Sequence, residues 1–277
     1  MAYGLLNGKR GIISGALDER SIAWRIALKA KEEGAIFTLT NAPIAMRMGE
    51  INKLAELCEA EIIPADATEV KDIENLYTKS MEVLGGKLDF VLHSIGTSPN
   101  IRKAREYGDL NYDWYQKSID VSALSFHKML QTAEKLDAIN EWGSVVALTF
   151  MAVQRTIPFY TDMAEAKAVL ESIARSYGYR YGKSKKVRVN TVSQSPTPTV
   201  AGSGIPGFDI FYEYAEKMAP LGNASADDCA NYVVTLFSDL TRMVTMQNLF
   251  HDGGFTLTGI SQEVMEAMQA EKQQKQE

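Results

Sequence analysis

The sequence alternates short apolar runs with longer amphipathic stretches from end to end, and no other feature limits its fold as strongly. The apolar runs, each a candidate strand, cover residues 11–14, 35–40, 61–66, 88–96, 143–150, 187–193 and 246–254. The longer stretches predict helices over about 21–33, 46–58, 70–84, 112–136 and 160–181. Strand and helix in turn are typical of a parallel sheet with both faces covered. We therefore predict an α/β fold, a Rossmann-like doubly wound parallel sheet of about seven strands with helices on both faces.

The 277 residues are enough for one large α/β domain with a buried core. No internal repeat or linker divides the chain, so residues 1–262 are expected to form a single domain. The segment 193–208, rich in Pro, Gly, Ser and Thr, predicts a long loop of the kind that often covers a binding site. An ordinary surface connection is the alternative. Residues 263–277 are expected to form a polar C-terminal tail, frayed over 271–277.

The composition argues against several classes of function. The formal net charge is −6 and no basic block is present, which argues against a nucleic-acid partner. The N-terminal segment has no signal-peptide pattern, and no apolar run approaches the roughly 20 residues that span a bilayer. Cys58 and Cys229 belong to no CxxC or Cys/His cluster, so neither a disulfide framework nor a metal site is expected. Two isolated cysteines fit a reducing, cytoplasmic setting.

Ligands of open parallel sheets bind at the carboxyl ends of the strands, so the residues just after each strand are the first candidates for a site. The first strand runs into SGALDERSIA (14–23), where Gly15 is followed by Ser21 and Ile22 at the start of a helix. The glycine-rich GxGxxG pattern is absent. A loop and a helix N-terminus can still hold a pyrophosphate, because free N–H groups and the helix dipole favour an anion. A simple turn capped by Ser21 is the alternative.

Two further strand ends strengthen the prediction of a dinucleotide site. Asp66, followed by Ala67, ends the third candidate strand, where it could accept from an adenine amino group or cap the next helix. Ser94, Ile95 and Gly96 end the fourth candidate strand. A glycine at position 96 would let the backbone approach the ribose and the nicotinamide closely.

The end of the second candidate strand normally decides the choice of dinucleotide, because an acid there holds the ribose diol and a base accepts a 2′-phosphate. Here residues 40–47 are TNAPIAMR, with no acid and with Arg47 several positions on. The sequence therefore leaves NADH and NADPH both open. His93, preceded by apolar residues in the fourth strand, is interpreted as a structural histidine.

Together with YTDMAEAK (160–167), VRVNTVS (187–193) and HDGGF (251–255), these segments resemble the enoyl-[acyl-carrier-protein] reductases of bacterial fatty-acid synthesis, a divergent branch of the short-chain dehydrogenases. The resemblance runs from about Leu5 to Gly259. It implies that residues 1–262 form a dinucleotide-binding reductase domain with a substrate-binding loop at about 196–219. It also implies NADH as cofactor, with NADPH possible, an acyl-carrier-protein-linked enoyl substrate, a cytoplasmic location and a homotetramer.

The separation of Tyr160 and Lys167 is the most specific part of the resemblance. Ordinary short-chain dehydrogenases have three residues between these two types, and Met163 stands here where that closer Tyr would be. Seven residues make about two helical turns with a rise of about 10.5 Å, so Tyr160 and Lys167 can share one face. The resemblance implies that both are catalytic. Tyr160 would donate to the thioester carbonyl and stabilise the enolate formed when hydride reaches the β-carbon of a trans-2-enoyl thioester. Lys167 would hold the nicotinamide ribose hydroxyls.

The resemblance assigns further residues to the site. Thr197 and Thr199 match contacts to the nicotinamide carboxamide and the phosphates. The apolar walls of the substrate pocket are expected from Phe150, Phe159, Tyr160, Met163, Ile205 and Phe208. Because carrier proteins are acidic, a basic patch is expected at the portal. The only obvious cluster is Lys183, Lys185, Lys186 and Arg188, which could instead solvate the end of a helix.

Two departures from the family pattern leave alternatives open. Phe150 stands where the family often has a second Tyr, and Ser195 where a glycine is common. A carbonyl-reducing short-chain dehydrogenase is one alternative, although Met163 argues against it. A nucleotide-binding, non-catalytic homologue is the other, because Phe150 lacks the second hydroxyl. The acyl-chain length, the inhibitor sensitivity and the effect of Phe150 are not determined by the sequence.

Overall fold

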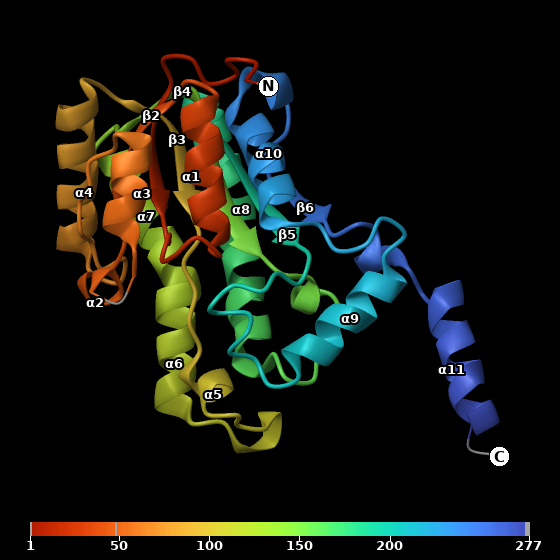
Figure 1. Ribbon diagram of the computed structural model, residues 1–277. Helices are drawn as coiled ribbons and strands as arrows, with labels where there is room; N and C mark the ends of the chain where they lie inside the picture. Colours follow the sequence, from red (N-terminus) through yellow and green to blue (C-terminus); the bar gives the residue numbers. More distant parts are fainter. Residues whose placement is uncertain (1, 48, 275–277) are drawn as a thin grey trace.

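A computed structural model describes residues 2–47 and 49–274 and confirms the predicted α/β fold, a Rossmann-like parallel sheet with helices on both faces (Figure 1). The strand order is β2-β1-β3-β4-β5-β6, and every pairing is parallel. The strands are β1 (Arg10–Ser14), β2 (Ile36–Thr40), β3 (Leu88–His93), β4 (Ile139–Thr149), β5 (Arg188–Gln194) and β6 (Asn248–His251). The order of the strands reverses between β1 and β3, and open parallel sheets bind their ligands at the carboxyl ends of the strands at such a point.

The described residues form six strands where the sequence predicted about seven, and the difference lies at 61–66. Ile62 makes only an isolated parallel bridge to Leu39 in β2. The Leu39 N–H donates to the Glu61 carbonyl at 2.9 Å, and the Ile63 N–H donates to the Leu39 carbonyl at 2.9 Å. The Ala65 N–H then donates to the carbonyl oxygen of Asn41 at 3.2 Å, one residue beyond the end of β2, so the pairing does not extend into a regular strand. The segment therefore lies beside β2, the strand at one end of the sheet, without becoming a strand.

Neighbouring strand residues pack on opposite faces of the sheet, as the two-residue period of a strand requires. Ile13, Leu92 and Val146 share a buried core with residues of α1 (Ile22–Glu32), α3 (Ile51–Cys58) and α10 (Ala226–Phe237). Their neighbours Ile12, Val91 and Val145 share a second core with α4 (Val70–Leu84), α7 (Ser125–Lys135) and α8 (Thr161–Lys185). The sheet therefore has helices on both faces and apolar residues buried on each.

The predicted helices are present with some subdivisions. The stretch 46–58 forms α2 (Pro43–Met46) and α3, while Met48 lies outside the described residues. The stretch 112–136 forms α6 (Tyr112–Ile119), the π-helical η2 (Asp120–Leu124) and α7 in succession. The elements that were not predicted are α5 (Pro99–Arg102), η1 (Tyr107–Asp109), η3 (Met151–Val153), α9 (Phe208–Met218), α10, η4 (Asp239–Thr241), η5 (Phe255–Leu257) and α11 (Gln262–Gln274).

The residues expected as a polar tail form α11, a helix that extends away from the body of the molecule (Figure 1). The fraying expected over 271–277 does not begin before Gln274, and residues 275–277 lie outside the described part. No residue of α11 is buried. Among residues 2–47 and 49–274, no helix combines the length and the apolar character needed to cross a bilayer.

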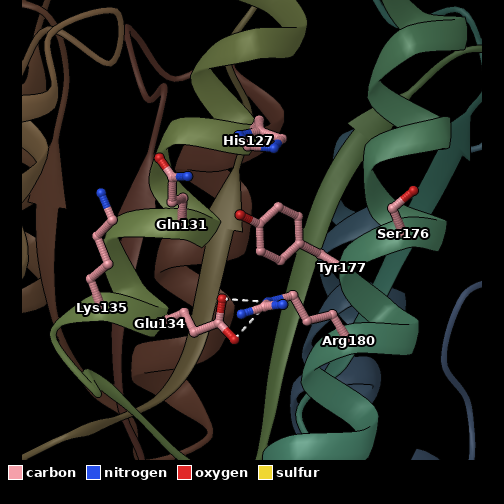
Figure 2. Close-up of a pocket in the computed structure, with 7 residues that line it drawn as sticks. All are labelled: His127, Gln131, Glu134, Lys135, Ser176, Tyr177 and Arg180. Carbon is pink, nitrogen blue, oxygen red and sulfur yellow. Dashed lines mark hydrogen bonds and ion pairs between the residues drawn. The ribbon is translucent and has the colours of Figure 1, made fainter.

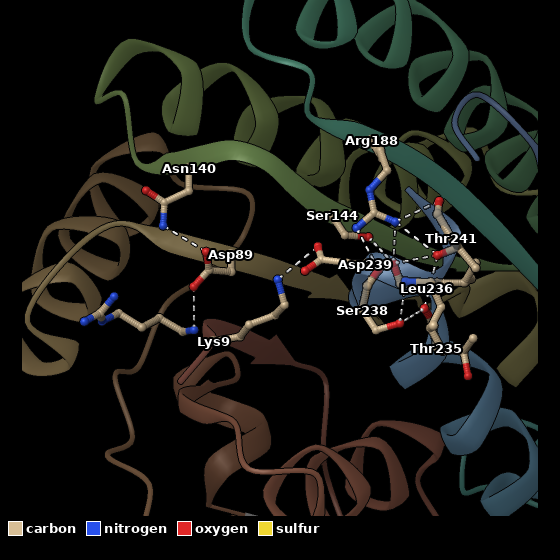
Figure 3. Close-up of polar contacts among 12 residues, drawn as sticks. Lys9, Asp89, Asn140, Ser144, Arg188, Thr235, Leu236, Ser238, Asp239 and Thr241 are labelled. Carbon is tan, nitrogen blue, oxygen red and sulfur yellow. Dashed lines mark hydrogen bonds and ion pairs between the residues drawn. The ribbon is translucent and has the colours of Figure 1, made fainter. Parts of the chain in front are cut away.

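Arg188 lies at the amino end of β5, where it joins the sheet to the end of α10 (Figure 3). Its guanidinium donates to the carbonyl oxygens of Leu236 at 2.9 Å, Thr241 at 3.1 Å and Ser238 at 3.2 Å. The side chain is buried, and burial lowers its pKa. Arg188 is thus a structural cation rather than part of a surface patch.

The remaining members of the predicted basic patch lie at the C-terminal end of α8, and Lys185 pairs there with Asp137. Tyr160 directly precedes the other end of this 25-residue helix. At 1.5 Å per residue the two ends are about 36 Å apart. The expectation that this cluster lies at the substrate portal is therefore wrong, and the alternative, a solvated helix end, describes it.

Candidate active site

Gly15 brings the end of β1 against the end of β3. Its φ is +90°, and a Cβ at this position would lie 1.9 Å from the carbonyl oxygen of Ser94. Neither this conformation nor this contact admits a side chain. Ser14 donates a hydrogen bond to the Leu92 carbonyl at 2.7 Å, and the Ser94 N–H donates to the Ser14 hydroxyl at 3.4 Å. Two predicted cofactor-binding residues, Gly15 and Ser94, therefore meet at the carboxyl edge of the sheet.

Ser21 occupies the N-cap position of α1, but its hydroxyl does not cap the helix. It accepts instead from the N–H groups of Leu17 at 3.0 Å and Asp18 at 3.1 Å, which holds the loop after Gly15. The N–H groups of Ile22 and Ala23 have no hydrogen-bond partner in the described part of the chain. Such free N–H groups at a helix start favour an anion.

Asp66 forms a small turn at the next strand end. Its Oδ1 accepts from the N–H of Thr68 at 2.9 Å and from the Thr68 hydroxyl at 2.7 Å. The N-cap of α4 is Glu69, so Asp66 does not cap that helix. Asp66 and Ala67 are both half-buried. The second carboxylate oxygen has no protein partner among the described residues, which leaves it free to accept from an amino group.

Gly96, Met163 and Lys167 come together where β3 ends beside α8. A Cβ on Gly96 would lie 3.5 Å from Met163 Cε and 3.7 Å from Lys167 Nζ. The Lys167 ammonium donates to the carbonyl oxygen of Leu148 at 2.8 Å. Ser94 and Ile95 are half-buried, whereas Gly96 is exposed. The backbone at Gly96 thus leaves open the space directly in front of the lysine.

Tyr160 precedes the first residue of α8 and is 8% exposed. Its hydroxyl has no hydrogen-bond partner among residues 2–47 and 49–274. Burial raises the pKa of this hydroxyl, so it keeps its proton well above neutral pH. It is a neutral hydrogen-bond donor without an acceptor, which is the state needed to polarise a carbonyl group.

Lys167 is buried, and burial lowers the pKa of its ammonium to about 8. The charge of Glu171, one turn further along α8, raises the pKa of Lys167 and so partly opposes the effect of burial. Burial also raises the pKa of Glu171, while a hydrogen bond from Thr149 at 2.8 Å opposes that shift. Lys167 is therefore mostly charged at neutral pH and loses its charge within the range in which enzymes are commonly assayed.

The apolar part of the predicted pocket is partly assembled. Tyr160, Met163, Phe150 and Ile205 belong to one apolar cluster, and the rings of Phe150 and Tyr160 have centroids 5.0 Å apart. Phe208 lies outside that cluster, against the turn at Gly202. Phe159, also expected as a wall, is 55% exposed. The fold therefore joins four of the six predicted wall residues.

The predicted cofactor contacts Thr197 and Thr199 stabilise their own loop. Thr197 donates to the carbonyl oxygen of Ser195 at 2.9 Å, and the Thr199 hydroxyl accepts from the N–H of Gly202 at 3.0 Å. Ser195, at the family's glycine position, accepts from the N–H of Ala224 at 2.9 Å. Each threonine hydroxyl keeps one free hydrogen-bonding position, since a hydroxyl both donates and accepts.

His93 is fully buried next to this site and has a structural role. Ser125 donates to the Val121 carbonyl at 2.7 Å, so it accepts from His93 Nε2, 2.8 Å away. Burial, with a smaller contribution from the charge of Lys167, lowers the pKa of His93 to about 3. The imidazole therefore stays neutral, which agrees with the sequence interpretation.

Two buried polar residues beside Tyr160 and Lys167 were not predicted from the sequence. Ser122, in η2, accepts from the Thr97 N–H at 3.0 Å and contacts Met163 Sδ at 3.5 Å. Asp162 lies two residues after Tyr160 and is completely buried. Asp162 was visible in the sequence, but an acid in the first turn of a helix is usually exposed. No sequence signal distinguishes Ser122 from other small helix residues.

A separate hollow of about 490 Å³ lies between α7 and α8 (Figure 2). Its lining includes His127, Tyr177, Arg180 and Glu134. Arg180 pairs with Glu134 at 2.7 Å, and the His127 and Tyr177 rings meet edge to face. Tyr177 is ten residues beyond Lys167, about 15 Å along the helix. This hollow is therefore distinct from the site around Tyr160.

A doubly wound parallel sheet, an anion-binding helix start at its switch point and a buried Tyr/Lys pair together define a dinucleotide-dependent oxidoreductase. The model of the family described as enoyl-(acyl carrier protein) reductase matches residues 15–256. The chain belongs to this family.

Individual relatives agree with the family match. The chain is 33% identical to enoyl-[acyl-carrier-protein] reductase [NADH] 1 of Rhizobium meliloti over 261 residues, 94% of each chain. The crystal structure of a FabI–NADH complex from Alistipes finegoldii matches with a TM-score of 0.94 and 62% identity, covering 95% of this chain and 93% of that one. The NADH-type reductase structure from Aquifex aeolicus matches with a TM-score of 0.85 and 30% identity, covering 92% and 99%.

Proposed function

We propose that the chain is an NADH-dependent enoyl-[acyl-carrier-protein] reductase of fatty-acid synthesis. It reduces a trans-2-enoyl thioester linked to the carrier protein, with hydride delivered to the β-carbon. The observation that carries the proposal is the buried hydroxyl of Tyr160, which has no hydrogen-bond partner among the described residues and precedes the helix whose Lys167 lies beside Gly96. The relatives named above favour neither a carbonyl reductase nor a non-catalytic homologue.

The residues at the carboxyl edge of the sheet fit a dinucleotide. Gly15 lets the end of β1 pack directly against Ser94, and the N–H groups of Ile22 and Ala23, which have no partner among the described residues, suit a pyrophosphate. The proposed contacts to the rest of the cofactor are made by Ser21, Asp66, Ala67, Ser94, Ile95, Gly96, Lys167, Thr197 and Thr199. NADH supplies the hydride.

NADH is favoured over NADPH for two reasons. The Rhizobium meliloti and Aquifex aeolicus relatives are named as NADH enzymes, and the Alistipes finegoldii structure is an NADH complex. In this chain Asn41 follows β2 and donates to the Ala16 carbonyl at 2.9 Å. A neutral amide held on the backbone offers no charge to a 2′-phosphate.

Tyr160 and Lys167 have separate roles in the proposed reaction. The Tyr160 hydroxyl donates to the thioester carbonyl oxygen, where negative charge develops as the β-carbon is reduced. Because its pKa is raised, Tyr160 stabilises that charge as a neutral donor. Lys167 binds the nicotinamide ribose hydroxyls with its ammonium and adds a positive field. The contribution of Tyr160 acts on the transition state rather than on the bound substrate, whereas Lys167 also binds the cofactor before the reaction.

The apolar part of the substrate lies against Phe150, Met163 and Ile205 in this proposal. Residues 196–219, which include α9, form the substrate-binding loop and bring Phe208 to the same pocket when it closes. Residues 1–262 then act as one reductase domain, with α11 beginning at its end.

A homotetramer in the cytoplasm is also part of the proposal. Large apolar side chains of Ile210, Leu257, Ile260 and Met268 are mostly exposed on this single chain. Exposed apolar groups of this size favour association with further copies. The molar mass measured by light scattering tests the assembly.

The test of the function is NADH oxidation, followed by absorbance, with crotonyl thioester as substrate and a matched ketone as comparison. We expect turnover with the enoyl thioester, NADH preferred to NADPH, and none with the ketone. Turnover with the ketone alone would favour the carbonyl reductase. Cofactor binding without any turnover would favour the non-catalytic homologue.

A further inference from the structure

A cluster of buried polar side chains surrounds Asp162, directly behind Tyr160. Asp162 Oδ1 accepts from the hydroxyls of Ser98 at 2.7 Å and Thr161 at 3.0 Å. Its Oδ2 accepts from Asn100 Nδ2 at 3.0 Å and from the Ser118 hydroxyl at 2.6 Å. These five residues, called the Asp162 cluster below, are all buried. No salt-bridge partner of Asp162 is present in the described part of the chain.

The Asp162 cluster joins three segments that are distant in the sequence. Ser98 caps α5 by accepting from the Ile101 N–H at 3.1 Å, Ser118 belongs to α6, and Thr161 and Asp162 start α8. Ser98 lies only two positions after Gly96, the last residue of the segment at the end of β3. A bond from Ser98 to Asp162 therefore connects the proposed cofactor-binding segment 94–96 to the start of the catalytic helix.

The carboxylate does not serve as an ordinary helix cap. Tyr160, the N-cap residue of α8, makes no side-chain cap bond, and the four bonds to Asp162 come from side chains. Burying a carboxylate is costly unless its oxygens are satisfied, and four donors achieve this without a cation. An asparagine has a single acceptor oxygen and could not reproduce the pattern.

The backbone next to Tyr160 is strained. Thr161 has φ of +27°, a region that a β-branched residue rarely adopts. Its hydroxyl bond to Asp162 is part of what holds this conformation. Strain of this kind persists only where the surrounding structure determines it, and it gathers at functional sites. These contacts determine the direction in which the chain enters α8. They therefore also determine the orientation of the Tyr160 side chain.

Phe150 makes an apolar contact with Tyr160 and provides no hydrogen bond to it. Its ring packs on the Tyr160 ring with centroids 5.0 Å apart, but it has no hydroxyl that could orient the Tyr160 hydroxyl. The side-chain hydrogen bonds that fix this part of the chain are therefore those of the Asp162 cluster.

We propose that Asp162 is a positioning residue, which holds Tyr160 at a fixed place relative to the cofactor-binding segment 94–96. This inference rests on the proposed function, because it concerns the aim of the Tyr160 hydroxyl at a bound thioester. Asp162 itself touches neither substrate nor cofactor in this proposal. Loosening the cluster should slow the chemical step without weakening the binding of NADH.

The experiment compares Ser118→Ala with Ser80→Ala in the full-length chain. Ser118→Ala removes one of the four bonds to Asp162, together with the 2.9 Å contact between the Ser118 hydroxyl and the carbonyl oxygen of Trp114 in the same helix. The other three bonds to Asp162 remain, so the variant is expected to fold. Ser80 is an equally buried serine that shares a 2.7 Å hydrogen bond with Thr38, far from Tyr160 in the second core. The measurements are kcat and KM with crotonyl thioester, the dissociation constant of NADH and the Tm. Asp162→Asn is the stronger variant, used if it folds.

We expect kcat of Ser118→Ala to fall about tenfold, since small misplacements of a catalytic group have large effects on rate. The NADH dissociation constant should stay within about threefold, and Ser80→Ala should lower Tm comparably without changing kcat. Equal losses of kcat in both serine variants would overturn the proposal.

A double-mutant cycle with Tyr160→Phe separates positioning from general destabilisation. If the cluster acts through the Tyr160 hydroxyl, Ser118→Ala should change the residual rate of Tyr160→Phe by less than about twofold, because the hydroxyl to be aimed is gone. The same tenfold loss in both backgrounds would show that the cluster acts otherwise. Absence of turnover in the unmodified chain would reject the proposed function itself, and NADH binding distinguishes that outcome from misfolding.

Discussion

Lys167 donates a hydrogen bond to the carbonyl oxygen of Leu148 across 2.8 Å, and both residues are buried. This bond holds the ammonium at the end of β4, opposite the open backbone of Gly96. An ammonium has three donors, so two remain for ribose hydroxyls while the Leu148 bond persists. The bond to Leu148 thus fixes the position of the ammonium group. Cofactor binding then depends on whether this group carries its charge.

Because the ammonium of Lys167 can lose its proton, we predict that the affinity for NADH depends on pH. Burial lowers its pKa to about 8, so NADH affinity should decline as the pH rises through this value. The Lys167→Arg variant should bind NADH less tightly, but its affinity should not decline as the pH rises, because arginine stays protonated. Titrations of NADH fluorescence between about pH 6 and pH 10 provide the check. A decline of equal midpoint in both proteins would assign the effect to another group.

The lowered pKa of Lys167 also makes the stability of the folded chain depend on pH. Between the folded pKa of about 8 and the ordinary value of 10.5, the unfolded chain binds the proton that the folded chain has released. Lys167 therefore contributes stability that increases with pH across this window. Chemical unfolding of the cofactor-free protein should show this increase relative to Lys167→Met, which has no proton to lose.

Tyr160→Phe removes the proposed donor to the thioester carbonyl. We expect kcat to fall about 10²- to 10³-fold, the usual effect of losing one such donor. NADH binding and Tm should change little, since the hydroxyl has no partner among the described residues. Steady-state kinetics with crotonyl thioester and a fluorescence titration give both values. Activity within a few-fold of the unmodified chain would show that another group polarises the carbonyl.

Phe150→Tyr tests the residue at which this chain departs from its family. The ring is half-buried and packs on Tyr160, so an added hydroxyl should fit at the cost of about 1 to 3 kcal/mol if it remains unpaired. We expect kcat to stay within about tenfold, because Tyr160 already provides the donor. An increase beyond that range would mean that the missing hydroxyl limits the present enzyme.

Gly15→Ala should disrupt the nucleotide end. An added Cβ would meet Ser94 O at 1.9 Å, and φ is +90°, so both space and conformation oppose it. We expect loss of NADH binding and a lower Tm. Gly8→Ala is the matched control, because Gly8 has φ of +72° with nothing within 4 Å. The control should lose only about 1 to 2 kcal/mol of stability for the left-handed backbone.

Glu33 lies far from the candidate active site, and its carboxylate is expected to make the folded state less stable at acid pH. Burial alone would raise its pKa, but bonds from Lys29 and from the N–H groups of Leu5 and Tyr3 lower it to about 2. Its stabilising effect is present above the ordinary value of 4.5 and is lost as the pH falls toward 2. Glu33→Gln should therefore be less stable at neutral pH, with the difference shrinking in acid. A constant difference in urea unfolding would contradict this assignment.

The local pattern of the sequence was sufficient to predict most of the sheet and its covering helices. Apolar strand runs such as 88–96 and the 3.6-residue period of α4 and α8 are properties of neighbouring residues, which remain visible without the fold. The segment 61–66 shows the limit. Its composition matches a strand, but it pairs only with the last residues of β2 and forms a single bridge.

The order of residues in the chain also predicted which segments reach the site, because strand ends of a parallel sheet meet at one edge. It could not predict that the Ser21 hydroxyl turns toward the loop, or that Phe208 packs outside the cluster of Tyr160 and Met163. Side-chain direction at a helix start or in a loop depends on contacts with distant segments. The predicted portal patch failed for the same reason, since Arg188 became buried against the end of α10.

The sequence by itself determined the fold class, the family and the Tyr160/Lys167 pair, because each depends on the spacing of residues along one chain. Only the tertiary structure decided the state of those two groups and the surroundings of Asp162. Burial raises the pKa of Tyr160 and lowers that of Lys167. The carboxylate of Asp162 is satisfied by side chains from α5, α6 and α8 together. Desolvation and long-range hydrogen bonds arise between residues that are far apart in sequence, so no local pattern contains them.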